Sequence, residues 1–195
     1  MTGAADEKPI RAFVALDLDD AMRRRLADLI ETLRGPFNGV RWVRPEGIHL
    51  TLRFLGYDRR DRLDALGDAL RGLANESTAG AAEVSGLGTF PQRGRARVLW
   101  IAIHLPDSVL RLQQACEGAA VAAGFEPETR PFAPHLTLGR WPEPARPPAL
   151  PPADLGRTAL DTLVLYRSQP GPGGSVYTKM RTFPLPRSAA SGREA

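Results

Sequence analysis

Two of the three histidines in this 195-residue chain begin the same four-residue sequence. The two copies are His49-Leu50-Thr51-Leu52 and His135-Leu136-Thr137-Leu138. In a β-strand, residues i and i+2 lie on the same face. Each copy would therefore place an imidazole beside a hydroxyl, with two leucines anchoring the opposite face. Threonine favours strands and has a stiff side chain, so ordering its hydroxyl costs little entropy.

Two such strands lining one cavity would supply the groups that attack on a phosphodiester requires. The pKa of a free imidazole lies near neutrality, so one histidine can accept a proton while the other donates one. Threonine hydroxyls can donate to the phosphate oxygens on which negative charge develops. We therefore predict that His49 and His135 are catalytic and that Thr51 and Thr137 bind the phosphate.

Zinc binding is the main alternative use of paired histidines. A zinc site usually needs three or four protein ligands, and neither motif contains a second histidine, a cysteine or a carboxylate. The repetition of the whole motif in two halves of the chain favours catalysis. The third histidine, His104, has no threonine two positions later, and we expect it to be non-catalytic.

The charged residues suggest a partner without identifying one. The formal net charge is +4, and arginine supplies nearly all of the positive charge, since Lys8 and Lys179 are the only lysines. A guanidinium binds phosphate through a planar fork, which suits a polyanionic partner. Alanine, glycine and proline are also abundant, so a general compositional bias explains the arginines equally well.

The sequence also bounds the compartment. The single cysteine, Cys116, excludes an internal disulfide and is typical of a reducing environment. No apolar run approaches the length of a membrane span, and the N-terminus lacks the apolar core of a signal peptide. We expect a cytoplasmic protein with no membrane attachment that acts as a monomer.

Strand-like and helix-like patterns alternate along the chain, which predicts a mixed α/β (α+β) domain with helices packed outside the sheets. The helical patterns begin at Asp19 or Asp20 and end at Arg34, and recur over 61–74 and 107–123. Strand patterns cover 10–18, 40–43, 48–55, 82–87, 98–105, 134–140, 160–166 and 176–183.

Two internal segments and the two ends of the chain are predicted to be irregular. Residues 142–152 contain six prolines, and residues 170–174 are Pro-Gly-Pro-Gly-Gly. We expect a flexible N-terminus over 1–9, a single domain over 10–187 and a disordered tail over 188–195.

The paired motifs and the order of their flanking segments resemble the 2H phosphoesterase superfamily. The resemblance is closest to its RNA 2′,3′-cyclic phosphodiesterases, also called 2′-5′ RNA ligases, and covers roughly residues 10–185. The matching segments are Arg11-Ala12-Phe13-Val14-Ala15, Arg41-Trp42-Val43, His49 to Gly56, Gly88-Thr89-Phe90-Pro91, Arg97-Val98-Leu99-Trp100, Pro134 to Arg140, and Leu165-Tyr166-Arg167-Ser168.

This resemblance implies a bilobal fold in which two antiparallel sheets flank a central cleft, with no metal or organic cofactor. It implies hydrolysis of 2′,3′-cyclic phosphate ends of RNA or nucleotides to 2′-phosphomonoesters, and some members also join 2′-5′ RNA ends. His49 would be the proton donor and His135 the proton acceptor, although the residues themselves do not distinguish the two. Arg140 would bind the phosphate. Strict alternation places Arg140 on the face opposite His135, so this role requires a bulge at Gly139.

Three further residues are open to more than one interpretation. Phe13 lies on the non-core face of the first strand, where it would either stack on a base or pack within the protein. Arg53 shares a face with His49 and is either a substrate contact or a solvated side chain, and Trp42 is expected to be structural.

The same four motif residues would also serve other activities. The alternatives are a related phosphodiesterase acting on 2′-5′ oligonucleotides or ADP-ribose cyclic phosphate, a non-catalytic nucleotide-binding module, and a generic α/β RNA-binding domain.

Overall fold

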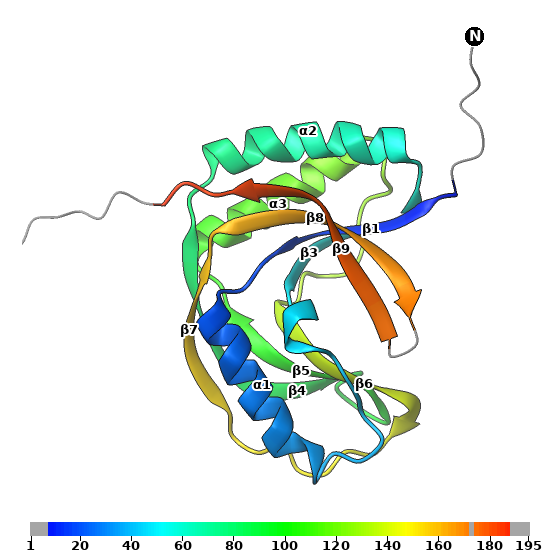
Figure 1. Ribbon diagram of the computed structural model, residues 1–195, viewed down its shortest axis with the longest axis vertical. Coiled ribbons are helices and arrows are strands. Elements are labelled where there is room, and N and C mark those ends of the chain that lie inside the picture. The colour runs from blue at the N-terminus through cyan, green and yellow to red at the C-terminus, as the bar shows by residue number, and fades with distance from the viewer. Residues whose placement is uncertain (1–7, 172–173, 188–195) are drawn as a thin grey trace, which may run out of the picture.

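The computed structural model describes residues 8–171 and 174–187. Within these residues the strands form one antiparallel, strongly curled sheet in the order β7-β4-β5-β6-β3-β1-β8-β9, and β2 pairs with β6 (Figure 1). The elements, in chain order, are β1 (Ile10–Leu16), α1 (Asp20–Arg34), β2 (Arg41–Trp42), the 3-10 turn η1 (Pro45–Gly47), β3 (Leu50–Asp58), α2 (Arg60–Glu76), β4 (Gly80–Phe90), β5 (Ala96–His104), α3 (Asp107–Ala122), β6 (His135–Ala145), β7 (Asp154–Leu160), β8 (Thr162–Gly171) and β9 (Gly174–Pro184).

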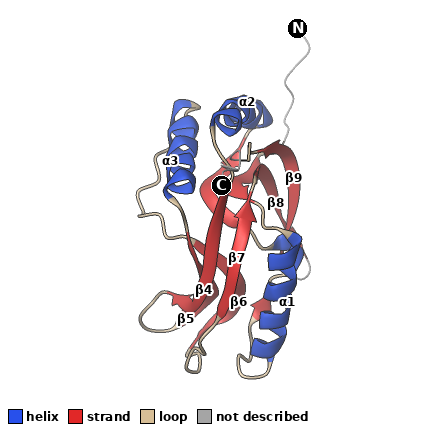
Figure 2. Cartoon of the chain, turned by 90° about the vertical axis from the view of Figure 1, so that its left-hand side faces the viewer, coloured by secondary structure: helices blue, strands red, loops and turns tan. Residues whose placement is uncertain are grey.

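The sheet consists of two lobes that meet between the two histidine motifs. The first lobe contains β1, β3, β8 and β9, and the second contains β2, β4, β5, β6 and β7. They are joined where Leu50 of β3 pairs with Leu136 of β6. The predicted bilobal arrangement is confirmed, and this pairing links its two sheets into one. Helices α2 and α3 lie together against the first lobe, and α1 lies against β7 of the second (Figure 2).

Leucines of the two motifs anchor both catalytic segments in the main core. Leu50, Leu136 and Leu138 are completely buried, and Leu52 is 3% exposed. Burying a leucine side chain contributes about 1.5–3 kcal/mol, so each motif is held firmly from behind. The alternation predicted from the sequence therefore does fix which face of each strand meets the core.

Strand β1 is buried on both faces because it lies between β3 and β8. Val14 and Leu16 belong to the main core, as their alternation predicted. Phe13 and Ala15, on the other face, form a second buried cluster with Tyr166. This second cluster lies directly beneath the site described below.

Two predictions about element boundaries were wrong. Strand β6 continues to Ala145 through Pro142 and Pro144, because its pairing with β2 ends at Arg140 and leaves β6 with a free edge. A proline without an N–H is tolerated at such an edge. The strand predicted over 160–166 is divided between β7 and β8, and β7 itself was missed.

The predicted helix start is confirmed: Asp19 caps α1 by accepting a hydrogen bond from the Met22 amide at 2.7 Å. The N-terminal segment up to residue 7, residues 172–173 of the predicted loop, and the predicted tail over 188–195 lie outside the described residues. No helix within the described part of the chain combines the length and the apolar composition that a membrane span requires.

Candidate active site

His49 is positioned by the turn that precedes β3. Its Nδ1 donates a hydrogen bond to the carbonyl of Gly47 at 2.8 Å. Because a carbonyl only accepts, this bond places a proton on Nδ1 and leaves Nε2 for a substrate. The Arg23 guanidinium, from α1, donates to three carbonyls around the same turn, those of Pro45, Glu46 and Ile48, at 3.0, 3.0 and 3.1 Å. Arg23 therefore ties the turn that orients His49 to helix α1.

His135 repeats this arrangement on the second lobe. Its Nδ1 donates to the carbonyl of Ala133 at 2.7 Å, so its Nε2 is also left for a substrate. Proline stiffens this segment on both sides of the carbonyl, at Pro131 and Pro134, and restricts Ala133 itself to an extended backbone. Covalent stiffness therefore accompanies this carbonyl, whereas an arginine brackets the other.

The antiparallel pairing of the motifs brings their chemistry together. Because Leu50 pairs with Leu136, the register places His49 beside Thr137 and Thr51 beside His135. All four side chains line a single cleft of about 670 Å³. Two imidazoles and two hydroxyls thus face one cavity, as the shared motif predicted.

Aromatic rings surround His49. The Phe13 ring stacks on the imidazole with a centroid distance of 4.6 Å, Tyr166 lies beyond it at 5.6 Å, and Tyr177 meets it edge-on at 5.0 Å. Burial by these rings lowers the pKa of His49 to about 4, against opposing effects of the Gly47 hydrogen bond and the negative charge of Asp17. In the free protein at neutral pH, His49 is therefore neutral.

His135 is packed differently. Phe90 meets its ring edge-on at 5.0 Å, and Trp100 lies tilted at 6.3 Å. A side chain at Gly88 would collide with the Trp100 ring, with a closest approach of 2.1 Å, so glycine is needed for this packing. Burial lowers the pKa of His135 below its usual value, and the positive charge of Arg140 lowers it further.

A buried carboxylate lies behind His49. Asp17 is 8% exposed, accepts a hydrogen bond from the Tyr166 hydroxyl, and pairs with Lys179 at 2.5 Å and Arg23 at 3.5 Å. These contacts connect the ring that stacks beneath His49 to the arginine that holds its turn. The residue types alone gave no sign of this network, because its members are far apart in the sequence.

The bulge required to bring Arg140 into the cleft is present. The β5–β6 register shifts between Leu99 and Trp100, which pair with Gly139 and Thr137, so Leu138 is the extra residue. Leu138 and Gly139 are consecutive buried positions, and Arg140 emerges on the face of His135 and lines the cleft. Gly139 is required here because a side chain would meet Val40 at 2.3 Å.

Phe13 is not the exposed aromatic that a base-stacking role requires. It is 2% exposed, with one neighbour stacked at His49 and another at Tyr166, 5.1 Å away. It supports the imidazole instead. Phe54, which the sequence did not single out, lines the cleft and is 45% exposed. Its position was hidden because register shifts between β1 and β3 change the alternation after Thr51.

The other ambiguous residues have structural contacts. Arg53 is 7% exposed, pairs with Glu117 at 2.5 Å and donates to the Phe54 carbonyl at 2.6 Å, so it is not solvated. Trp42 packs against the main core, beneath Arg34. His104 is exposed, contacts Ser85 at 3.3 Å and does not line the cleft.

The described residues include no group of three or more histidine, cysteine, aspartate or glutamate side chains arranged to hold a metal ion. The donors in the cleft are imidazole, hydroxyl and guanidinium groups. Such a set can accept a proton, donate a proton and bind phosphate oxygens.

The sequence profile of the LigT like phosphoesterases matches residues 16–100 and 103–177. The chain belongs to this family. The LigT-like phosphoesterases are 2H enzymes, so the membership that the motifs indicated is confirmed. Both histidine motifs lie within the matched segments.

Two curated relatives named RNA 2′,3′-cyclic phosphodiesterase match nearly end to end. The protein from Methanothermobacter thermautotrophicus is 31% identical over 183 residues, covering 90% of this chain and 99% of the relative. The protein from Thermus thermophilus is 34% identical over 186 residues, covering 90% of each.

Solved structures agree with this placement. A crystal structure of a Thermus thermophilus protein superimposes with a TM-score of 0.81 and 31% identity, covering 91% of this chain and 99% of that one. A crystal structure of E. coli LigT complexed with 3′-AMP gives a TM-score of 0.78 at 26% identity, covering 91% and 98%.

Proposed function

We propose that this LigT-like phosphoesterase hydrolyses 2′,3′-cyclic phosphate ends of RNA, or the corresponding cyclic nucleotides, to 2′-phosphomonoesters without a metal. The observation that carries the proposal is the matched pair of imidazoles. Each has its Nδ1 proton engaged by a backbone carbonyl, and both line one cleft with Thr51 and Thr137. The names of the curated relatives and the nucleotide bound by E. coli LigT support the same substrate class.

The charges around the two histidines favour one assignment of their roles. His135 accepts a proton from the attacking water, because Arg140 beside it disfavours an imidazolium. His49 donates a proton to the leaving 3′ oxygen, because the carboxylate of Asp17 favours an imidazolium there. Burial opposes protonation of His49 in the free protein, and the negative charge of a bound phosphate opposes that effect in turn.

The remaining contacts hold the reacting phosphate and the nucleoside. Thr51 and Thr137 donate to non-bridging oxygens, and Arg140 offers a two-pronged contact. Phe54, exposed in the cleft, is placed to stack on the base, a role that Phe13 cannot fill from beneath His49. A Phe54→Ala variant should raise the KM for 2′,3′-cyclic AMP with little change in kcat.

The test is incubation with 2′,3′-cyclic AMP in excess EDTA, followed by phosphorus NMR and chromatographic separation of 2′-AMP and 3′-AMP. The expected product is 2′-AMP, formed at the same rate with and without EDTA. A mainly 3′-AMP product would reverse the acid and base assignment. Activity that is lost in EDTA and restored by zinc or magnesium would refute the metal-independent mechanism.

The same substrate separates the competing activities. A non-catalytic binding module would bind cyclic AMP without turnover. A phosphodiesterase specific for 2′-5′ oligonucleotides or ADP-ribose cyclic phosphate would turn over those compounds and leave cyclic AMP intact.

A further inference from the structure

Two arginines occupy directly opposed positions at the edge of the cleft. Arg41 of β2 pairs with Arg140 of β6, and Trp42 pairs with Gly139. Directly opposed residues of antiparallel strands point to the same face of the sheet, with Cβ atoms about 4.5–5.5 Å apart. The two guanidinium groups therefore extend from neighbouring strands on one face.

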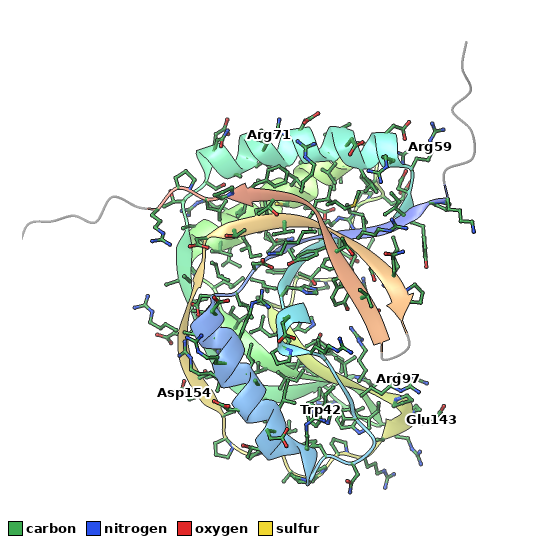
Figure 3. The ribbon with its side chains drawn as sticks, viewed as in Figure 1. Trp42, Arg59, Arg71, Arg97, Glu143 and Asp154 are labelled. Atoms are coloured by element: carbon green, nitrogen blue, oxygen red, sulfur yellow. The ribbon has the colours of Figure 1, made fainter. Side chains whose placement is uncertain are left out.

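The face they share is that of the cleft. Trp42 packs on the core side, where its ring would lie 3.4 Å from a Cβ added at Gly139. The next positions along the two strands, Arg41 and Arg140, must then lie on the opposite side. Arg140 lines the cleft, and Arg41 is exposed beside it. Figure 3 shows Trp42 at the end of the second lobe that also carries Arg97.

Neither arginine is neutralised by the protein. In the described part of the chain, no carboxylate lies within ion-pair distance of Arg41 or Arg140, while their neighbour Arg34 pairs with Glu31 at 2.8 Å. Like charges placed directly opposite each other in a sheet are destabilising. Such a pair is favourable only when an anion lies between or above the two groups.

We propose that Arg41 binds the phosphodiester on the 5′ side of the terminal nucleotide, while Arg140 holds the cyclic phosphate at its 3′ side. This rests on the proposed function and names its substrate class: RNA ends of two or more nucleotides. The nearest anion to a reacting phosphate in an RNA strand is the next phosphate along the backbone. Arg41 is the exposed cation directly opposite Arg140 on the paired strands, so it is placed to meet that group.

Two substrates isolate the contact. 2′,3′-cyclic AMP has only the reacting phosphate, whereas the dinucleotide ApA ending in a 2′,3′-cyclic phosphate adds one upstream phosphodiester. The variants are Arg41→Gln and, as a matched control, Arg24→Gln, which removes an exposed charge from α1. KM and kcat are measured for both substrates over a range of salt concentrations.

Arg41→Gln should raise the KM for the dinucleotide about threefold to tenfold and leave cyclic AMP hydrolysis unchanged. The slope of log KM against log salt for the dinucleotide should fall by about 0.7, the value for one contact to a single-stranded phosphate. Arg24→Gln should change neither substrate.

Other outcomes separate the two levels of the argument. An equal loss on both substrates would mean that Arg41 contacts the reacting phosphate, and no loss on either would mean that it contacts none; both overturn the upstream contact. Absence of cyclic AMP hydrolysis by the wild-type protein would instead overturn the proposed function itself.

Discussion

The two histidines share a motif and a hydrogen-bond pattern, yet the surroundings that hold them differ. His49 lies among Phe13, Tyr166 and Tyr177, with a buried carboxylate behind it. His135 meets Phe90 and Trp100 at its edge and has Arg140 as its charged neighbour. The repeated motif supplies two equivalent imidazoles, and the non-repeated residues around them make them different.

The supports of the two orienting carbonyls differ in the same way. Arg23 brackets the Gly47 carbonyl through three backbone contacts, a non-covalent support that one substitution can remove. The Ala133 carbonyl lies between two prolines, whose stiffness is covalent. The His49 side is therefore the one whose geometry depends on distant side chains.

The largest expected effect is the same for both histidines despite these differences. General acid–base catalysis typically contributes about 10²–10⁴-fold, so His49→Ala and His135→Ala should each reduce the kcat for 2′,3′-cyclic AMP by at least about 100-fold. His104→Ala should change it less than about threefold, because His104 lies outside the cleft. A large loss at His104 in a folded protein would mean that the site is elsewhere.

The next effect tests the difference between the two supports. Arg23→Gln should lower kcat about 10- to 100-fold with KM nearly unchanged, because small misplacements of a catalytic group are costly. The control is Arg25→Gln on the same helix, which also removes hydrogen bonds to carbonyls, those of Leu155 and Arg157, but away from the site. Both variants should lose similar thermal stability.

Only the Arg23 variant should lose turnover. Equal kcat losses in the two variants would reduce Arg23 to a structural residue and remove the proposed asymmetry between the supports.

Comparing these residues with the sequence shows which features a pattern can predict. The histidine–threonine pairs, the buried leucines and the bulge near Gly139 could be predicted because each depends on local alternation along one strand. Phe54 and β7 could not, because register shifts and Gly156, with a φ of 67°, interrupt the alternation there. The role of Phe13 required knowing that Tyr166 would lie beneath it.

The polar network of Asp17, Arg23 and Lys179 is also a product of tertiary structure. Asp17 directly follows β1, Arg23 lies in α1 and Lys179 in β9, and nothing in their spacing relates them. The same holds for the pairing of Arg41 with Arg140, which depends on where β2 meets β6.

The smallest expected effect is on the pH dependence. Burial lowers both imidazole pKa values, so the maximum of kcat/KM should lie below pH 6.5, the ordinary value for histidine. The charged groups acting on His49 are Asp17, which raises its pKa, and Arg23 and His135, which lower it. Asp17→Asn removes the only one of these that favours the imidazolium, so the low-pH limb should move to lower pH.

The matched control for this shift is Lys179→Gln. It breaks the same ion pair but removes a positive charge, so the low-pH limb should not move downward. A downward shift in both variants would indicate a structural effect of the broken pair. An unchanged limb in Asp17→Asn would remove the electrostatic argument for His49 as the proton donor.

The central claim is that two differently supported histidines form one phosphate site, and NMR titration of the histidine side chains tests it most directly. The His49→Ala and His135→Ala variants assign the resonances. The free protein should show a pKa of about 4 for His49 and a pKa below 6.5 for His135. Addition of 2′-AMP should shift both resonances with a single dissociation constant, raise the pKa of His49, and leave His104 unchanged. A ligand that shifts only one of the two motif histidines, or shifts them with separate dissociation constants, would contradict the shared site.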